Sequence, residues 1–374
     1  MRVNIEPAMN NDSSSYSLIP DWSRLRKRYA ALWKKKVLDG GFIAQIQNPV
    51  PVADGIVRAE GFSENDYLNP EKLLQMKQDR RSGWQWHYDL FLYEIPSYGP
   101  NVFIGFCGAK VSFGNNTAWH EPAISSLDEA DKVHFEENNF YWKRTLEIVD
   151  YFIEKCKGRK QIGMSDFGGP ADWIASVMGT ENFLVESIQQ PDRMRDFALR
   201  LARESRKAFD TVYAKIRRQN DGVVNWMPVW NEISLSTAQD DIAVNLSPDL
   251  YKKVFLPALK EMALQGKSCV LHWHDACRHH LDNLLEIKEL EVIQYGHDPT
   301  TGDFKEHIGS MQKIQKAGKI LFITCVEAKD VEFFVNNLDP RGLAMIINTA
   351  DAEGSKRMAD RIPRLTETRL GNIC

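Results

Sequence analysis

Short apolar or aromatic runs alternate with longer helical stretches along most of this chain of 374 residues. Each run ends in polar residues, and the intervals between runs show helical periodicity and helix caps, such as Ser247 followed by Pro248. This alternation favours βα units with parallel strands, and eight such units close a (β/α)8 barrel. The eight predicted strands are residues 41–49, 87–95, 161–169, 223–232, 268–275, 290–298, 319–328 and 342–350. The sequence therefore predicts an α/β fold, a (β/α)8 TIM barrel.

Two long segments in the N-terminal half, residues 65–87 and 96–133, interrupt the rhythm, and we interpret them as insertions in one domain. Residues 1–20 have the composition of a flexible tail, which leaves residues 21–374 as a single TIM-barrel domain. The insertions are rich in aromatic residues. These either line a substrate pocket above the barrel mouth, with Trp84, Trp86 and Trp119 as binding residues, or pack as a small core beneath the loops.

Charge and composition narrow the class of protein. The formal net charge is −4 and no segment is densely basic, so we do not expect a nucleic-acid partner. The start of the chain lacks the pattern of a secretory signal, and no run of about 18 apolar residues occurs, so no membrane association is expected. Six scattered cysteines without a CxxC pair suit a reducing cytoplasm.

The stretch HWHDACRHH, residues 272–280, lies at the end of a predicted strand. Active sites of TIM barrels form at the carboxyl ends of the strands, and His272 and His274, two residues apart, point to the same face of an extended strand. Trp273 faces the opposite way. Catalytic zinc needs three protein ligands, and the candidates for the third come from neighbouring strand ends: His297, Cys325, Glu327 and Glu232. We take Cys325 as the predicted third ligand. The alternative is a pair of histidines that binds substrate without metal.

Other polar residues at predicted strand ends are candidates for proton transfer and substrate binding. Asp166 precedes a Gly-Gly-Pro turn, and the alternative for it is a helix cap. The run NEISLSTAQDD offers the carboxylates of Glu232, Asp240 and Asp241 for a base or a cation, or is only a solvated loop. We expect His279 and His280 to cap or pack a helix. The predicted catalytic residues are Asp166, Glu232 and His297, and the predicted polar substrate-binding residues are Asn231 and Asn348.

Three tracts between residues 161 and 349 resemble the uroporphyrinogen decarboxylase superfamily. SDFGGPADWIASVMGTENFLVESIQQPDRM is similar to its strand-3 region, and NLSPDLYKKVFLPALKEM to its SPxxFxxFxxPxxK segment. CVLHWHDACRHHLDNLLEIKELEVIQYGHDP, followed by MQKIQKAGK, is similar to its HxxG…KIqxaGK tract. The arginine-rich motif that binds propionates in the decarboxylases is absent from the N-terminal region. The resemblance therefore implies a TIM-barrel enzyme of this superfamily that does not act on uroporphyrinogen itself.

Zinc methyltransferases of the same superfamily use an H-x-C pair and a later cysteine as ligands. His272 matches the first ligand, His274 stands in place of the cysteine, and the later position falls in INTAD, which has none. A site poor in sulfur is better suited to Lewis-acid polarisation than to thiol activation.

The leading hypothesis is a zinc-dependent methyltransferase acting on a small methylated substrate, with a corrinoid protein or a thiol as methyl acceptor. The alternatives are a decarboxylase or lyase acting on a small carboxylated substrate, for which Arg81 and Lys110 are the available carboxylate receptors, and a non-catalytic binding barrel. A homodimer is also expected.

Overall fold

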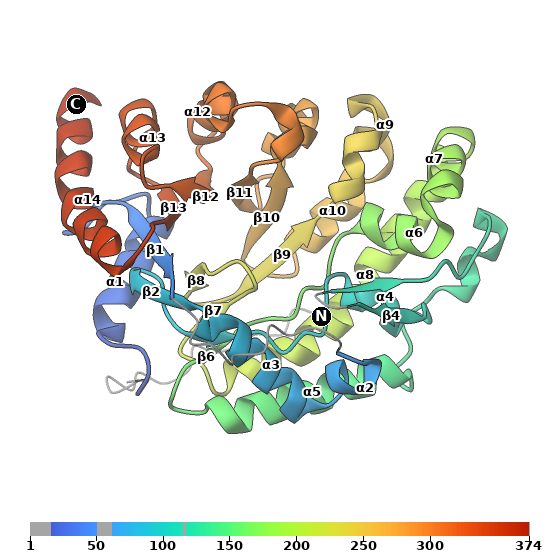
Figure 1. Ribbon diagram of the computed structural model, residues 1–374. Coiled ribbons are helices and arrows are strands. Elements are labelled where there is room, and N and C mark those ends of the chain that lie inside the picture. Colours follow the sequence, from blue (N-terminus) through green and yellow to red (C-terminus); the bar gives the residue numbers. More distant parts are fainter. Residues whose placement is uncertain (1–15, 51–61, 115–116, 374) are drawn as a thin grey trace.

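The computed structural model describes residues 16–50, 62–114 and 117–373. Its largest sheet has seven strands in the order β2-β1-β13-β12-β11-β10-β9 (Figure 1). All neighbours in this sheet are parallel except β2, which pairs antiparallel with β1. The strands are β1 (Ile43–Pro49), β2 (Trp84–Tyr88), β9 (Leu235–Gln239), β10 (Ser268–His274), β11 (Leu290–Gly296), β12 (Ile320–Glu327) and β13 (Leu343–Asn348).

Three two-stranded sheets accompany the large one. The pair of β3 (Tyr93–Glu94) and β6 (Gln161–Ile162) is parallel. The pairs of β4 (Val111–Phe113) with β5 (Ala118–His120), and of β7 (Val223–Val224) with β8 (Trp230–Asn231), are antiparallel. One parallel bridge between Gly163 and Val224 connects the segment after β6 with β7.

Helices lie in an arc around the strands of the large sheet in Figure 1. The long helices bury an apolar side, as α8 does through buried residues at helical spacing such as Met194, Phe197 and Leu201. The helices are α1 (Trp22–Trp33), α2 (Glu64–Tyr67), α3 (Pro70–Ser82), α4 (Val102–Phe106), α5 (Phe140–Cys156), α6 (Pro170–Met178), α7 (Thr180–Gln189), α8 (Pro191–Arg217), α9 (Pro248–Val254), α10 (Leu256–Ala263), α11 (Leu281–Leu285), α12 (Ile308–Lys316), α13 (Val331–Asn337) and α14 (Ala352–Ile373). Short 3-10 helices are η1 (Leu127–Lys132), η2 (Asp241–Asn245), η3 (Asp275–His280), η4 (Pro299–Thr301) and η5 (Phe304–His307).

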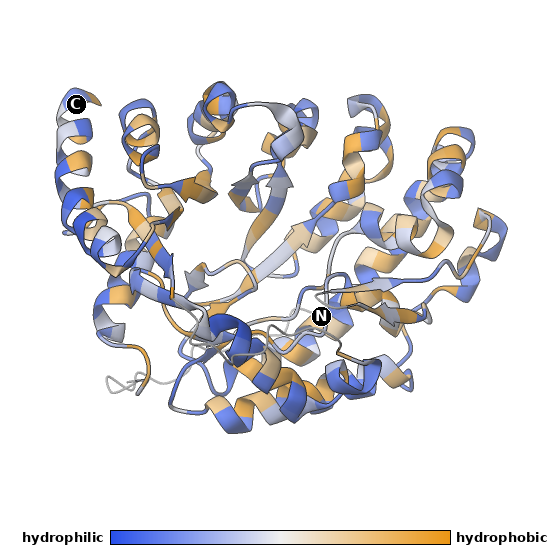
Figure 2. Cartoon of the chain, viewed as in Figure 1, coloured by the Kyte–Doolittle hydropathy of each residue, from blue (hydrophilic) through white to orange (hydrophobic). Residues whose placement is uncertain are grey.

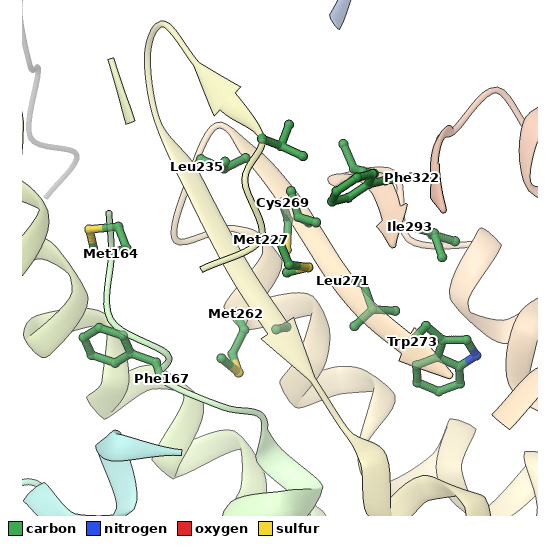
Figure 3. Close-up of a cluster of buried hydrophobic side chains, with 14 of the residues drawn as sticks. Met164, Phe167, Met227, Leu235, Met262, Cys269, Leu271, Trp273, Ile293 and Phe322 are labelled. Carbon is green, nitrogen blue, oxygen red and sulfur yellow. The ribbon is translucent and has the colours of Figure 1, made fainter. Parts of the chain in front are cut away.

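Several strands of the large sheet are apolar and appear orange in Figure 2, as is expected of parallel strands that are covered on both faces. Figure 3 shows part of this core, with Leu271 and Trp273 from β10, Ile293 from β11 and Phe322 from β12, all of them buried. The α/β class predicted from the alternation of strands and helices is confirmed. Within the described ranges, no helix has both the length and the apolar composition that a membrane span requires.

The fourth predicted strand, residues 223–232, was placed wrongly. This segment forms β7 and β8, a hairpin, and the large sheet continues instead with β9. Pro228 lacks an N–H group and cannot continue a strand ladder, so the apolar run is interrupted there. The sequence of β9, LSTAQ, is too polar to stand out as a core strand, although all five residues are buried.

The N-terminal tail was predicted to reach residue 20, but its last residues belong to the packed structure. Tyr16 is buried, its ring lies 5.4 Å from that of Trp22, and its hydroxyl accepts a hydrogen bond from the Asp221 N–H. Backbone hydrogen bonds also connect residues 17 and 18 with the end of α5. The remainder of the predicted tail, residues 1–15, lies outside the described residues.

The two predicted insertions fold into short elements that belong to the same body. They contain α2, α3, β2, α4, the β4–β5 hairpin and η1, and part of the second insertion, residues 115–116, lies outside the described residues.

Candidate metal centre

β10 brings His272 and His274 to one point, as the sequence predicts. The strand lies between β9 and β11, and its alternation turns Trp273 to the opposite face, where it is 1% exposed. The two histidine Nε2 atoms are 3.0 Å apart, and the ring planes are at 85° to each other. Two imidazole nitrogens on one zinc ion, each at about 2.0–2.1 Å, would be about 2.8–3.4 Å apart for angles of about 90–109°. The histidine pair therefore fits a shared metal ion.

The third donor near this pair is Asp241, at the start of η2, directly after β9. Its Oδ1 lies 3.9 Å from His272 Nε2, and the ligand atoms of Asp241, His272 and His274 all lie within 4.8 Å of one another. The side chain of Asp241 is 50% exposed. Among the residues that the structure describes, this is the one group of three such side chains close enough to hold a metal.

The tautomer of His272 is set by its neighbour across β10 and β11, Gln294. The amide Nε2 of Gln294 donates to Thr324 Oγ1 at 2.8 Å, so its Oε1 is left to accept from His272 Nδ1. The proton of His272 is then on Nδ1, and the lone pair on Nε2 faces His274 and Asp241. Burial lowers the pKa of His272, and the carboxylate of Asp241 only partly offsets that effect. The sequence reasoning missed Gln294, a polar residue in the middle of an apolar strand.

The ring of His274 has no such partner within the described part of the chain. Its Nδ1 is buried and makes no hydrogen bond there, and Gly296 is its nearest backbone neighbour on β11. A 3.0 Å separation of the two Nε2 atoms also suits an N–H···N hydrogen bond, with the proton on His274. Two arrangements therefore fit the same atoms: a metal ion shared by the two Nε2 atoms, or a direct hydrogen bond between them without metal. Measuring the metal content distinguishes these two arrangements.

Asp166 lies beside this centre, in the segment between β6 and α6. Its Oδ1 accepts a hydrogen bond from the Gly168 N–H at 3.0 Å. Burial raises the pKa of Asp166 to about 7, and the carboxylates of Asp241 and Asp172 act in the same direction. A carboxyl group that gains or loses its proton near neutral pH is suited to general acid–base chemistry.

His297 follows β11 directly and is held by a buried carboxylate. Its Nδ1 lies 2.8 Å from Oδ2 of Asp275, which is fully buried, and its ring stacks on Phe304. The same carboxylate accepts the Asp298 N–H at 2.9 Å and lies 3.6 Å from His307 Nε2. This arrangement holds His297 with Nε2 pointing away from Asp275, which is the geometry of an oriented general base.

Cys325, the predicted third ligand, is not part of the three-residue group. It lies in an irregularity of β12 between Ile323 and Val326, where its φ is +60°, and it is exposed. The extra residue of a β-bulge leaves the regular alternation of side chains, so spacing along the strand did not predict where this thiol points. Asp241 is instead the third member of the candidate group.

Glu232 and Asn231 lie before β9, at its amino end, whereas Asp241 follows its carboxyl end. Glu232 is exposed, and Asn231 Oδ1 accepts the N–H groups of Ile233 and Ser234 in a turn. The prediction that these residues share the rim with the histidines was wrong, because it depended on the misplaced fourth strand.

The three predicted aromatic residues do not form one cluster. Trp84 and Trp86 are on β2, whereas Trp119 is on the β4–β5 hairpin, which Figure 1 shows well away from β2. Trp84 and Trp119 are exposed. Asn348 is at the carboxyl end of β13, as predicted, where its Oδ1 accepts from Gln47 Nε2 at 3.0 Å.

Trp86 is connected with the histidine pair through two further aromatic residues. Its ring lies 5.8 Å from that of Tyr93, whose hydroxyl donates to the Trp226 carbonyl at 3.4 Å. The ring of Trp226 in turn meets His272 edge-on at 5.0 Å. Trp226 was not among the predicted site residues, because the strand assigned to residues 223–232 gave no reason to single it out.

His279 and His280 were predicted not to be ligands, and their contacts agree with a packing role. Their Nε2 atoms contact backbone carbonyls of Leu246 and Ala243, at 3.1 and 2.8 Å.

The fold and the site together define an α/β protein with a candidate metal centre of two histidines and one aspartate. No model of a known protein family matches the sequence, and no curated protein matches it either. The resemblance to the uroporphyrinogen decarboxylase superfamily stays a prediction from its motifs.

Proposed function

We propose that this chain is a metal-dependent enzyme that transfers a methyl group from a small methylated compound, with Asp241, His272 and His274 as metal ligands. The observation that carries the proposal is the convergence of the two histidine Nε2 atoms, 3.0 Å apart, beside a carboxylate. A divalent ion bound there, with zinc as our first choice, would act as a Lewis acid on the heteroatom that carries the methyl group.

We also propose that the parallel strands close into the (β/α)8 barrel of the uroporphyrinogen decarboxylase superfamily. Six parallel strands, β1 and β9 to β13, are continuous in the large sheet, and the parallel pair of β3 and β6 would supply the other two. In support, Gly169 after β6 lies so close to the end of β9 that an added Cβ would be 1.4 Å from the Gln239 carbonyl oxygen. The metal ligands would then lie at the carboxyl ends of strands four and five.

The donor set favours an oxygen or nitrogen substrate over a sulfur one. Two imidazoles and a carboxylate are harder ligands than thiolates and leave a more electron-poor ion, which binds oxygen and nitrogen well. When the methyl group leaves such a heteroatom, the heteroatom needs a proton. Asp166, whose pKa is raised to about 7, can carry that proton near neutral pH, and its carboxyl group interacts electrostatically with that of Asp241.

The acceptor is a thiol or a corrinoid protein. With a thiol, His297 would take the thiol proton on Nε2 while Asp275 stabilises the resulting imidazolium. The proton that Asp166 gives to the leaving heteroatom balances the proton that His297 receives. A corrinoid acceptor brings no such proton, so His297 would then be dispensable.

A decarboxylase or lyase receives less support from the structure. Such an enzyme needs a cation to bind the substrate carboxylate, and the two candidates from the sequence are both in ion pairs. Arg81 is paired with Glu94, which is fully buried, and Lys110 with Glu121 on the surface. Methyl transfer makes no demand for a free cation, so it stays the first choice.

Metal content tests the proposal before any substrate is known. The protein purified without chelators should hold about one zinc or other divalent ion per chain by elemental analysis. The His272→Ala, His274→Ala double variant should lose it, whereas Glu232→Gln, far from the ligands, should keep it. The proposal fails if the unaltered protein neither holds a divalent ion nor binds added zinc or cobalt. If it binds metal but does not turn over methylated compounds, the non-catalytic binding protein is the better explanation.

A further inference from the structure

The segment that carries Asp166 and the segment that carries Asp241 are joined by hydrogen bonds in both directions. In each direction a carboxylate of one segment accepts backbone N–H groups of the other. Asp172, in the first turn of α6, accepts the Ile242 N–H at 2.9 Å, and the N–H of Asp241 also points at this carboxylate. In return Asp240 accepts the Ala171 N–H at 2.8 Å. Each segment therefore supplies both a carboxylate and the backbone donors that the other segment's carboxylate binds.

Both carboxylates are enclosed. Asp240 is fully buried and Asp172 is 7% exposed, and the second oxygen of Asp240 accepts the Tyr251 hydroxyl of α9 at 2.8 Å. Asp241 is held at its other backbone end as well, where its carbonyl oxygen lies 3.9 Å from Cys277 Sγ. The backbone of the metal ligand is thus fixed on both sides, while its own carboxylate stays half exposed beside the histidines.

A glycine permits the close approach that this exchange requires. A side chain on Gly169 would overlap both the Gln239 carbonyl, as noted above, and Oδ1 of Asp240, at 2.7 Å. The preceding Gly168 has a φ of +85°, a conformation that other residues rarely adopt. The two segments pack backbone against backbone, so a shift of one displaces the other.

We propose that Asp172 and Asp240 are positioning residues that hold Asp241 at the distance needed to share a metal with His272 and His274. This inference depends on the proposed metal site. It explains how the half-exposed carboxylate of Asp241 is kept in position. Asp172 acts through the backbone of Asp241, and Asp240 acts through α6. Neither side chain touches the metal.

Cobalt binding tests this role without any need for a substrate. Asp172→Ala should weaken Co²⁺ affinity about 10- to 100-fold, as losses of groups that orient metal ligands do, and should change the visible d–d absorption band. Asp172→Asn keeps an oxygen that accepts the Ile242 N–H, so it should bind Co²⁺ within about threefold of the unaltered protein. Recovery by asparagine would show that the acceptor matters for the site.

The matched control is Asn139→Ala. Asn139 accepts the N–H groups of Tyr141 and Trp142 at the start of α5, so this variant loses comparable cap bonds at a helix outside the site. It should lower the thermal midpoint and leave Co²⁺ affinity and spectrum unchanged. An Asp172→Ala protein that matches Asn139→Ala in both respects would overturn the positioning role.

Tyr251→Phe covers the case in which Asp172→Ala does not fold. It removes only the hydroxyl that binds Asp240 and should weaken Co²⁺ affinity by about 3- to 10-fold. An unchanged affinity in Tyr251→Phe would contradict the role of Asp240. If the unaltered protein itself binds no Co²⁺, the metal site is wrong and this inference falls with it, whereas normal binding in every variant refutes the inference alone.

Discussion

His272 and Gln294 face each other across β10 and β11 and are joined by a hydrogen bond between Nδ1 and Oε1. They are direct partners in the register of the two strands, and Gln294 is 3% exposed. A buried amide in the middle of a strand needs partners for both of its ends, and Thr324 and His272 provide them. The pairing of two strands thereby determines which nitrogen of His272, a candidate metal ligand, carries the proton.

Replacing Gln294 by leucine should weaken zinc affinity by about 10- to 100-fold. Leucine cannot accept the Nδ1–H of His272, so the ring loses its fixed orientation and tautomer. Competition with a chromophoric zinc chelator measures this effect directly. Thr324→Val, which removes only the second contact of the amide, should have a smaller effect, and equal affinities in all three proteins would mean that Gln294 is only a core residue.

Asp166 predicts a dependence of stability on pH. Its pKa is raised from 3.8 to about 7, so the fold favours the protonated carboxyl. That contribution is fully present below about pH 4 and is lost as the pH rises through about 7, and three pKa units correspond to about 4 kcal/mol at most. Urea unfolding of chelated protein should show this decline.

The Asp166→Asn variant should lack that part of the slope, because asparagine does not ionise. Asp172, whose pKa burial also raises to about 7, titrates in both proteins and keeps part of the slope in the variant. Identical pH profiles of unfolding free energy would show that Asp166 is hydrated and ordinary, which would also remove it as a proton donor.

Cys325 should react with iodoacetamide at the same rate in metal-loaded and chelated protein. The thiol is exposed but lies outside the group of candidate metal ligands. Burial of part of the residue raises the pKa of this thiol, so the reaction should be slow at neutral pH and should accelerate as the pH rises. Peptide mapping by mass spectrometry identifies the labelled site. Protection of Cys325 by metal would restore it as a ligand.

Asp89 should matter for stability and not for metal binding. It is fully buried, its two oxygens accept the Nε and Nη2 groups of Arg28 at 2.6 Å, and it also accepts the Ala44 N–H. Asp89→Ala leaves the Arg28 guanidinium buried and unpaired, which should cost about 3–5 kcal/mol of unfolding free energy. Chemical denaturation measures the loss. A loss of zinc without a loss of stability would be the opposite of this expectation.

The sequence predicted the histidine pair because the prediction needed only two properties: that the segment is a strand, and that side chains alternate between the two faces of a strand. His272, Trp273 and His274 follow from period two, and burial of Trp273 is the expected result. Asp241 could not be assigned in the same way. It follows β9, whose residues Ser236, Thr237 and Gln239 are polar, and their burial depends on neighbours that no local pattern reveals.

The misplaced fourth strand accounts for most of the other errors. Residues 223–232 are more apolar than β9, and hydrophobicity therefore selected the wrong segment and with it Glu232 and Asn231. Cys325 lies outside the three-residue group for a different reason, since a single extra residue in β12 changes the direction of a side chain without changing the composition of the strand.

The placement of the donors on β9 and β10 also has a consequence for the order in which the centre is completed during synthesis. Asp241, His272 and His274 follow one another along the chain, so a ribosome makes all three before it makes β11, β12 or β13. Gln294 is on β11 and comes later. An emerging chain can therefore present all three donor residues while His272 is still free to change its tautomer. The docking of β11, which brings Gln294 to His272, is the step that fixes the tautomer.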